Sequence, residues 1–178
     1  MPKIEIRPAV ATDVAILMKM DHSVSSDYVW QMDFVQGEDQ AGAAFREIRL
    51  PRSIQITYPR PIPNLSEDWS RNSGMLVATA EKVIIGYTRI SEKVIPYNAL
   101  ITDVVVSPAY RRKGVGSALV LSAQGFASKR GSRQIMMEMT SKNAAGIRLA
   151  RKMGYEFCGY NDHYYLTQEV ALFFVHSL

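Results

Sequence analysis

The sequence is poor in cysteine and contains no long apolar run. Its 178 residues include a single cysteine, Cys158, which excludes an intramolecular disulfide. No apolar segment reaches the roughly 18 to 20 residues of a membrane span, and residues 1–5 lack the apolar stretch of a signal peptide. The cysteine and the histidines show no metal-ligand spacing. These absences predict a cytoplasmic protein with neither a metal nor a membrane partner.

An excess of charge of one sign is also absent. The formal net charge is +4, with 47% hydrophobic and 21% charged residues, which is ordinary for a globular protein. The length suits a single domain over residues 1–178. Basic residues gather at positions 111–113 and 129–133, but no aromatic residues alternate with them as on nucleic-acid-binding surfaces. We therefore expect no nucleic-acid partner.

The most informative stretch is a glycine-containing turn that follows the apolar run 100–106. Gly114 and Gly116 remove side chains from this turn, so that successive backbone N–H groups can converge on an anion. A helix expected over residues 115–128 directs the positive end of its dipole to the same place. The turn therefore predicts a phosphate-binding site.

The spacing within this turn excludes two common nucleotide motifs. A mononucleotide P-loop has its lysine after the last glycine, whereas Lys113 precedes Gly114. A dinucleotide fingerprint has a third glycine where this chain has Leu119. The phosphate therefore belongs to a different kind of ligand.

Two motifs in the second half of the chain occur in a fixed order. Arg111, Gly114 and Gly116 form an Arg-x-x-Gly-x-Gly pattern after a strand. Further along, a strand at residues 134–140 precedes a helix that opens at Asn143 and stops at Gly154 and Tyr155. Together the motifs cover residues 100–158 and resemble the pyrophosphate-binding turn and the following strand and helix of the GCN5-related N-acetyltransferases, the GNAT family.

The resemblance implies an α/β fold: a GNAT-like domain with a mixed central sheet flanked by helices and splayed between the two central parallel strands. The alternation of strands and helices in the second half agrees with this class. Strands are expected at residues 4–7, 53–58, 75–79, 83–90, 100–106, 134–140, 155–160 and about 164–174, and helices at 115–128 and 143–153. The strands 75–79 and 83–90 are expected to form a hairpin around residues 80–82.

Three regional expectations complete the predicted fold. Thr12 or Asp13 can cap a first helix, and the apolar strand 100–106 is expected to be buried on both faces. Residues 22–50 are less regular. The resemblance implies that a region of about 22–72 determines the acceptor and that residues 100–158 form the acetyl-CoA-binding core.

Acetyl-CoA is the co-substrate that the resemblance implies. Backbone groups of Val104, Val105 and Val106 are then expected to contact the pantetheine and the acetyl carbonyl. The residues expected to hold the pyrophosphate are Arg111, Arg112, Lys113, Gly114, Val115, Gly116 and Ser117. Asn143 is expected both to cap its helix and to hydrogen-bond to the pantetheine arm.

Acyl transfer to an amine also needs a proton acceptor, because an amine with a pKa of about 10 is protonated at neutral pH. Glu138 lies where some protein-acetylating members of the family use a glutamate as base, although a strand carboxylate can instead bond to nearby backbone. Asp103 interrupts an apolar run and either binds a cationic acceptor or removes its proton. His163 is a third candidate because histidine titrates near neutrality.

The proton for the departing thiolate has no obvious donor. The family often uses a tyrosine at the position where this chain has Ala150. Tyr160, Tyr164 or Tyr165 then takes its place, with Tyr164 as our candidate, or solvent supplies the proton. Solvent suffices because a thiol with a pKa of about 8.5 leaves readily as a thiolate.

Acidic and aromatic residues are frequent in the first half of the chain and could receive a polyamine or an aminoglycoside-like antibiotic. They are Asp27, Tyr28, Trp30, Asp33, Glu38, Asp39 and Trp69. Near the other end, residues 164–174 resemble the tail of streptothricin acetyltransferases.

These observations predict an acetyl-CoA-dependent N-acetyltransferase that acts on a primary amine of a small molecule. The resemblance implies direct attack on the thioester in a ternary complex. A protein or peptide amine as acceptor, a CoA-binding module without turnover, and assembly as a homodimer stay open as alternatives.

Overall fold

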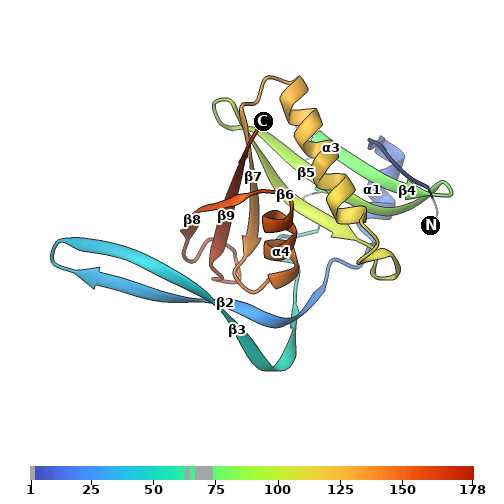
Figure 1. Cartoon of the computed structure of the whole chain (residues 1–178). Helices are drawn as coiled ribbons and strands as arrows, with labels where there is room; N and C mark the ends of the chain where they lie inside the picture. Colours follow the sequence, from blue (N-terminus) through green and yellow to red (C-terminus); the bar gives the residue numbers. More distant parts are fainter. Residues whose placement is uncertain (1–2, 63–64, 67–73) are drawn as a thin grey trace.

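A seven-stranded mixed sheet and a separate two-stranded hairpin form the framework of the protein (Figure 1). The computed structural model describes residues 3–62, 65–66 and 74–178. In chain order the elements are β1 Ile4–Pro8, α1 Ala11–Leu17, β2 Val24–Gly37, β3 Gln40–Ile56, β4 Gly74–Ala80, β5 Val83–Ile95, β6 Asn98–Val106, a 3-10 turn Pro108–Tyr110, α3 Val115–Lys129, β7 Gln134–Thr140, α4 Ala144–Lys152, β8 Glu156–Asn161 and β9 Ala171–Ser177. The order of strands in the large sheet is β1-β4-β5-β6-β7-β9-β8.

The β6–β7 pair confirms the predicted splayed α/β sheet. These two strands run parallel, and residues 98–101 pair with residues 134–137. Both strands then continue, to Val106 and to Thr140, without further pairing to each other. The flanking pairs β5–β6 and β7–β9 are antiparallel and stay paired along these stretches. A gap therefore opens in the middle of the sheet.

Helices cover both faces of the sheet. Leu119 of α3 packs with Ala78 of β4, whereas Leu17 of α1 packs with Val77, the preceding residue on the same strand. Since successive side chains of a strand point to opposite faces, α1 and α3 lie on opposite sides of the sheet, as Figure 1 shows. Within the described residues, no helix is long and apolar enough to cross a membrane.

The hairpin of β2 and β3 differs from the predicted irregular region at 22–50 and short strand at 53–58. The two strands pair along their whole length with one register shift. The outer end extends away from the main sheet (Figure 1), while near the base the ring of Trp30 lies 6.0 Å from that of Phe174 on β9. Because residues 34–41 at the outer end are all exposed, this part of the sequence lacks the alternation that signals a half-buried strand.

The first helix is capped differently from the prediction. Val10 is the N-cap residue, and the Asp13 carboxylate accepts the Val10 N–H at 2.8 Å from within the first turn. The same carboxylate receives two hydrogen bonds from Arg7, at 2.6 and 3.0 Å. The hydrogen bonds from Arg7 hold the pKa of Asp13 below its ordinary value. Capping by Thr12 or Asp13 is therefore wrong, although Asp13 still stabilises the helix start.

The last strand is shorter than predicted. β9 begins at Ala171 and not near residue 164. His163 and Gln168 have positive φ angles of 54° and 61°, so the chain turns between β8 and β9. Tyr164 consequently lies in this turn and not on a strand.

β6 is buried mainly on one face and not on both. Ala99, Ile101, Asp103 and Val105 are buried, and the alternate residues are half-buried. The gap beside β7 accounts for the difference, because Val104 and the other residues at the end of β6 face a cavity.

Other predicted elements are confirmed. β4 and β5 form a hairpin whose turn residues Glu81 and Lys82 have φ angles of 49° and 66°, as a tight two-residue turn requires. β7 has the predicted bounds. α4 follows Asn143, and Gly154 ends it with a φ of 81°.

Candidate active site

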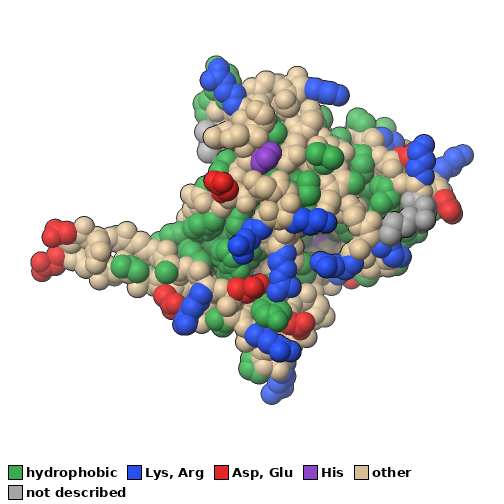
Figure 2. All heavy atoms as spheres, viewed as in Figure 1, with side chains coloured by type: hydrophobic (Ala, Val, Ile, Leu, Met, Phe, Trp, Pro, Cys, Tyr) green, Lys and Arg blue, Asp and Glu red, His purple; other side chains and the backbone are tan. Residues whose placement is uncertain are grey.

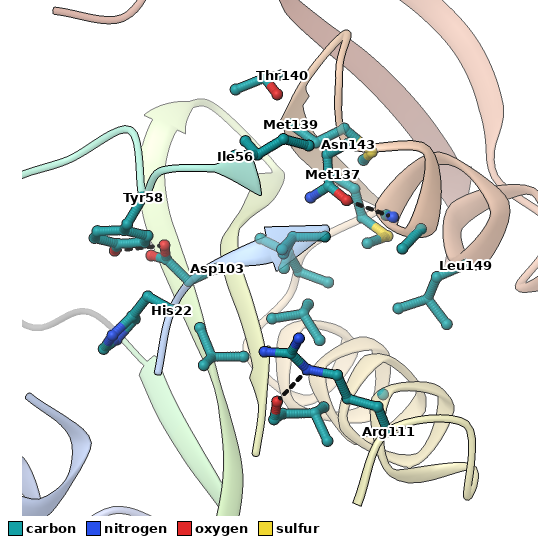
Figure 3. Close-up of a pocket in the computed structure, with 18 of the residues that line it drawn as sticks. His22, Ile56, Tyr58, Asp103, Arg111, Met137, Met139, Thr140, Asn143 and Leu149 are labelled. Atoms are coloured by element: carbon teal, nitrogen blue, oxygen red, sulfur yellow. Dashed lines mark hydrogen bonds between the residues drawn. The ribbon is translucent and has the colours of Figure 1, made fainter. Parts of the chain in front are cut away.

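A cavity of about 730 Å³ occupies the gap between β6 and β7 and extends to the turn before α3. Its volume is within the range of small-molecule sites, about 300 to 1,000 Å³. β6 lines it with residues 101–106 and β7 with residues 137–140. Figure 3 shows Tyr58 and Asp103 on one side of this cavity and Leu149 of α4 on another.

The two glycines of the turn have different tasks. Gly114 has a φ of +85°, in the left-handed region that favours glycine. Gly116 instead provides space, because a Cβ there would lie 3.3 Å from Leu149 Cδ2 and 4.0 Å from Val104 Cγ1. Both glycines line the cavity. The turn is therefore shaped for a ligand that approaches the backbone closely.

Backbone donors are available at the start of α3. The helical hydrogen bonds begin with Ala118 N–H to Gly114 O at 3.0 Å, so the amides of residues 115–117 lie outside the helix's own ladder. Amides in this position, together with the helix dipole, bind anions. The geometry fits a diphosphate.

The structure brings most of the predicted cofactor residues to the cavity. The nine that line it are Val104, Val105, Val106, Arg111, Arg112, Gly114, Gly116, Ser117 and Asn143. Val115 is instead buried in the core with Leu119, and Lys113 Nζ lies 5.4 Å from the centre of the Tyr110 ring. The individual binding roles remain predictions.

Arg111 and Asn143 also have structural tasks. Arg111 Nε donates to Val106 O at 2.9 Å (Figure 3). Its Nη2 donates to Ser23 O, also at 2.9 Å, which joins the end of β6 to the segment before β2. Asn143 Oδ1 accepts the Gly146 N–H at 2.9 Å. The predicted helix cap at Asn143 is thus confirmed.

Positive charge surrounds the α4 side of the cavity. Arg112, Arg148 and Lys152 contribute to its lining. Figure 2 shows Lys and Arg side chains gathered over α4. A ligand that carries phosphate would meet complementary charge here.

Asp103 is a buried carboxylate with a full set of partners. It lies opposite Arg89 in the β5–β6 register, and Arg89 Nε is 2.7 Å from Asp103 Oδ2. Tyr58 Oη donates to Oδ1 at 2.6 Å, and Thr102 Oγ1 donates to Oδ2 at 2.9 Å. These contacts offset the cost of burying a charge in an apolar strand.

Glu138 lies on β7 across the gap from Asp103. It is buried, forms an ion pair with Arg60, and accepts a hydrogen bond from Tyr164 Oη at 3.1 Å. Arg60 Nη1 is also 3.6 Å from Asp103 Oδ1. One arginine therefore links the two carboxylates that the sequence predicts as catalytic.

Three tyrosines near these carboxylates stay protonated. Burial raises the pKa of Tyr58, and the negative charge of Asp103 raises it further. Burial likewise raises the pKa of Tyr87 and of Tyr165. At neutral pH these three groups are therefore hydrogen-bond donors and not bases.

The sequence analysis misses four residues of the site. They are His22, Tyr58, Arg60 and Arg89. His22 Nε2 lies 2.9 Å from Tyr87 Oη, and its ring centre is 4.8 Å from that of Tyr58. Arg89 could have been found, because a buried Asp103 calls for a cation on the neighbouring strand. The other three come from loops whose approach no sequence spacing indicates.

The other positions considered for proton transfer lie at different places in the structure. His163 is exposed in the turn after β8, 3.2 Å from Asp162. Ala150 is fully buried in the core, and Tyr160 packs against Phe45 with ring centres 5.2 Å apart. Tyr165 lines the cavity.

The acidic and aromatic residues expected to receive the acceptor also lie elsewhere. Six of them belong to the β2–β3 hairpin and its turn: Asp27, Tyr28, Trp30, Asp33, Glu38 and Asp39. None of these six lines the cavity. Trp69 lies outside the described residues. The side of the cavity that carries the two carboxylates is made by the end of β3, the segment after it, β6 and β7.

This fold and this site together define an acyltransferase that uses a coenzyme A thioester. A model of the acetyltransferase (GNAT) family matches residues 43–155. Streptothricin acetyltransferase of Streptomyces lavendulae is 30% identical over 166 residues, which cover 90% of this chain and 86% of that protein. The chain belongs to the GNAT acetyltransferase family. It is an acetyl-CoA-dependent N-acetyltransferase.

Solved structures agree with this assignment. Nourseothricin acetyltransferase superposes with a TM-score of 0.82 at 25% identity, covering 98% of each chain. A Bacillus anthracis (strain Ames) protein of the streptothricin acetyltransferase type, solved with acetyl coenzyme A, has a TM-score of 0.75 at 20% identity, covering 99% of this chain and 98% of its own. The second likeness supports the fold.

Proposed function

We propose that the acceptor is a primary amine of a small cationic molecule, with a streptothricin-type antibiotic as the leading case. The pair of buried carboxylates Asp103 and Glu138, in the cavity that also reaches the glycine turn, carries this proposal. A cationic amine entering such a cavity gains charge-assisted hydrogen bonds. The 30% identity to a streptothricin acetyltransferase over most of the chain supports the same class of acceptor.

In this proposal the chain acts as one domain of residues 1–178. Residues 100–158 hold acetyl-CoA, and a region of about 22–72 shapes the acceptor side. Backbone groups of residues 104–106 bind the pantetheine and the acetyl carbonyl, and the amides of residues 112–117 bind the pyrophosphate. An N–H directed at the thioester oxygen stabilises the developing oxyanion.

The reaction is a direct transfer within a ternary complex. Glu138 takes a proton from the acceptor's ammonium group, and the free amine attacks the thioester carbon. A C–N bond forms and the C–S bond breaks, so coenzyme A leaves as a thiolate. Asp103 holds the cationic acceptor. Tyr164, whose hydroxyl lies 3.1 Å from Glu138, donates a proton to the departing thiolate and recovers one from Glu138. Glu138 then takes the second proton from the attacking nitrogen as the amide forms and releases it to solvent.

The release of free thiol from acetyl-CoA tests the acceptor. The amines tested are streptothricin, 1,5-diaminopentane, spermidine and a peptide with an N-terminal alanine, each at the same concentration. We expect streptothricin and the diamines to release thiol faster than the peptide. Faster turnover of the peptide would assign a protein acceptor, and tight CoA binding without turnover of any amine would indicate a binding module. Analytical ultracentrifugation distinguishes a monomer from a homodimer, the alternative that the sequence leaves open.

A further inference from the structure

Arg60 lies between the two carboxylates of the site, on the segment that follows β3. Its guanidinium forms an ion pair with Glu138, and Nη1 is 3.6 Å from Asp103 Oδ1. Nη1 also donates to Thr102 O at 3.1 Å, and the guanidinium carbon is 5.4 Å from the centre of the Tyr165 ring. The position that a cationic acceptor needs is therefore held by a cation of the protein itself.

The two carboxylates depend on Arg60 to different degrees. Asp103 has Arg89 Nε at 2.7 Å and Tyr58 Oη at 2.6 Å in addition to Arg60. In the described part of the chain, Glu138 has no cationic partner other than Arg60. Because a buried carboxylate without a partner is strongly destabilising, Glu138 needs a cation at this position at all times.

A permanent guanidinium is incompatible with the proton transfer proposed for Glu138. Arginine cannot be deprotonated in a protein. Arg60 pairs with Glu138 Oε1 and Tyr164 Oη bonds to Oε2, so neither oxygen is open to the acceptor's ammonium group. An ammonium group carries the same charge as the guanidinium. Exchange of one cation for the other therefore leaves the charge of the buried site unchanged.

Arg60 also separates two cavities. A second cavity, of about 340 Å³, is lined by Pro59, Arg60, Pro61, Tyr164, Tyr165 and Leu166. Three of these residues, Pro59, Arg60 and Tyr165, also line the main cavity. Leu166 is 81% exposed, so the second cavity lies at the protein surface. The Arg60 side chain can thus withdraw toward solvent without crossing the sheet.

We propose that Arg60 is an exchangeable internal cation, which pairs with Asp103 and Glu138 until the acceptor's ammonium group displaces it, and which makes the site selective for cationic acceptors. The proposal rests on the proposed function, because it needs an amine at Glu138. The need to displace Arg60 lowers the apparent affinity of the protein for the acceptor, because only protein molecules in which Arg60 has withdrawn can bind the acceptor. Neutral acceptors cannot replace Arg60 without leaving Glu138 unpaired.

Calorimetric titration of the CoA-bound protein with 1,5-diaminopentane tests this exchange. Arg60→Ala removes the competing cation, Arg60→Lys keeps the charge, and Lys129→Ala removes an exposed charge at the end of α3 as a matched control. We expect Arg60→Ala to bind the diamine about 10-fold more tightly than the wild type. Arg60→Lys and Lys129→Ala should stay close to the wild type.

A small guanidinium salt gives a second measurement on the same variants. Methylguanidinium chloride should bind to Arg60→Ala in competition with the diamine and should bind more weakly to the wild type, because it must first displace the guanidinium of Arg60. Unchanged or weaker diamine binding by Arg60→Ala, with CoA binding intact, would overturn the proposal.

If Arg60→Ala does not fold, the exchange can be tested on the wild-type protein by NMR. The NMR signal of the Arg60 Nε–H, assigned with Arg60→Lys, should move to the position of a solvent-exposed arginine when the diamine saturates the protein. A signal that stays in place overturns the exchange. Failure of the proposed function gives a different result: calorimetry and NMR show the exchange, but no small amine releases thiol.

Discussion

The two sides of the cavity present different kinds of groups, main-chain amides on one side and side chains on the other. On the glycine-turn side, the predicted contacts are backbone amides at the start of α3, placed by the φ of Gly114 and by the space beside Gly116. On the opposite side, the groups are side chains, and Asp103, Glu138 and Arg60 meet there from two strands and a loop. A site made of main chain tolerates many side chains, whereas a site made of side chains depends on the identity of each.

This difference predicts separate kinetic effects for the two sides. Changes on the side-chain side should alter turnover and acceptor binding but leave acetyl-CoA binding intact. Changes on the main-chain side should alter the KM for acetyl-CoA and leave the proton transfer intact. A variant that affects both equally would contradict the division.

The largest effect is expected from Glu138→Gln, which removes the proposed base and retains the shape. We expect kcat to fall by roughly 100- to 1,000-fold, the size of a general-base contribution, and the pH profile of kcat to shift. The KM for acetyl-CoA should stay near the wild-type value. Glu156→Gln, on exposed β8, is the control, and a wild-type kcat for Glu138→Gln at all pH values would remove Glu138 as the base.

Gly116→Val should have the next largest effect. The added side chain would contact Leu149 and narrow the cavity beside Val104, so we expect the KM for acetyl-CoA to rise by roughly 30-fold, equivalent to about 2 kcal/mol. Gly125→Val is a matched control in the same helix, since a Cβ at Gly125 meets nothing within 4 Å. Equal KM values for the two variants would show that the turn does not contact the cofactor.

Two substitutions separate the structural role of Asn143 from its predicted role in binding acetyl-CoA. Asn143→Ala should lower the free energy of unfolding by about 1 kcal/mol through loss of the N-cap, measured by urea denaturation. Asn143→Asp keeps a capping oxygen and should cost less than about 0.5 kcal/mol, but it adds negative charge beside the predicted pantetheine site. A KM for acetyl-CoA that rises in Asn143→Ala and not in Asn143→Asp would confine the residue to its capping task.

The Arg7–Asp13 pair offers a comparison outside the cavity. The hydrogen bonds from Arg7 lower the pKa of Asp13 in the folded state, so the pair stabilises the protein above the unfolded-state pKa of about 3.9. Because Arg7 is 42% exposed, we expect Asp13→Asn to cost about 1 kcal/mol at pH 7. The difference from the wild type should shrink as the pH falls through the folded-state pKa of Asp13, and both proteins should have the same KM values.

The smallest effect is expected from Cys158→Ser. Cys158 is exposed on β8 and does not line the cavity, so kcat/KM should change by less than about twofold, as for a surface substitution. A large loss of activity, together with ping-pong kinetics, would point to an acetylated cysteine and would contradict direct transfer.

The elements that the sequence predicts well are those fixed by short-range rules. The β4–β5 turn at Glu81 and Lys82, strand β7, and the helix between Asn143 and Gly154 all have local signals in capping, turn or alternating residues. The β2–β3 hairpin was missed because residues 34–41 at its outer end are exposed, so that no burial imposes alternation there.

The candidate site divides in the same way. The glycine turn and Asn143 could be found from sequence because their tasks depend on backbone geometry over a few residues. The surroundings of the carboxylates could not be found, since Arg60 reaches Glu138 over a sequence separation that no local pattern spans.

The sequence by itself therefore determined the order of strand, turn and helix and with it a phosphate-binding backbone, because glycine conformations and helix dipoles are local properties. Only the tertiary structure decided where β6 and β7 part, and which side chains fill the gap. That depends on the packing of loops and strands distant in the chain, where the burial of Asp103 and Glu138 requires cations from β5 and from the segment after β3.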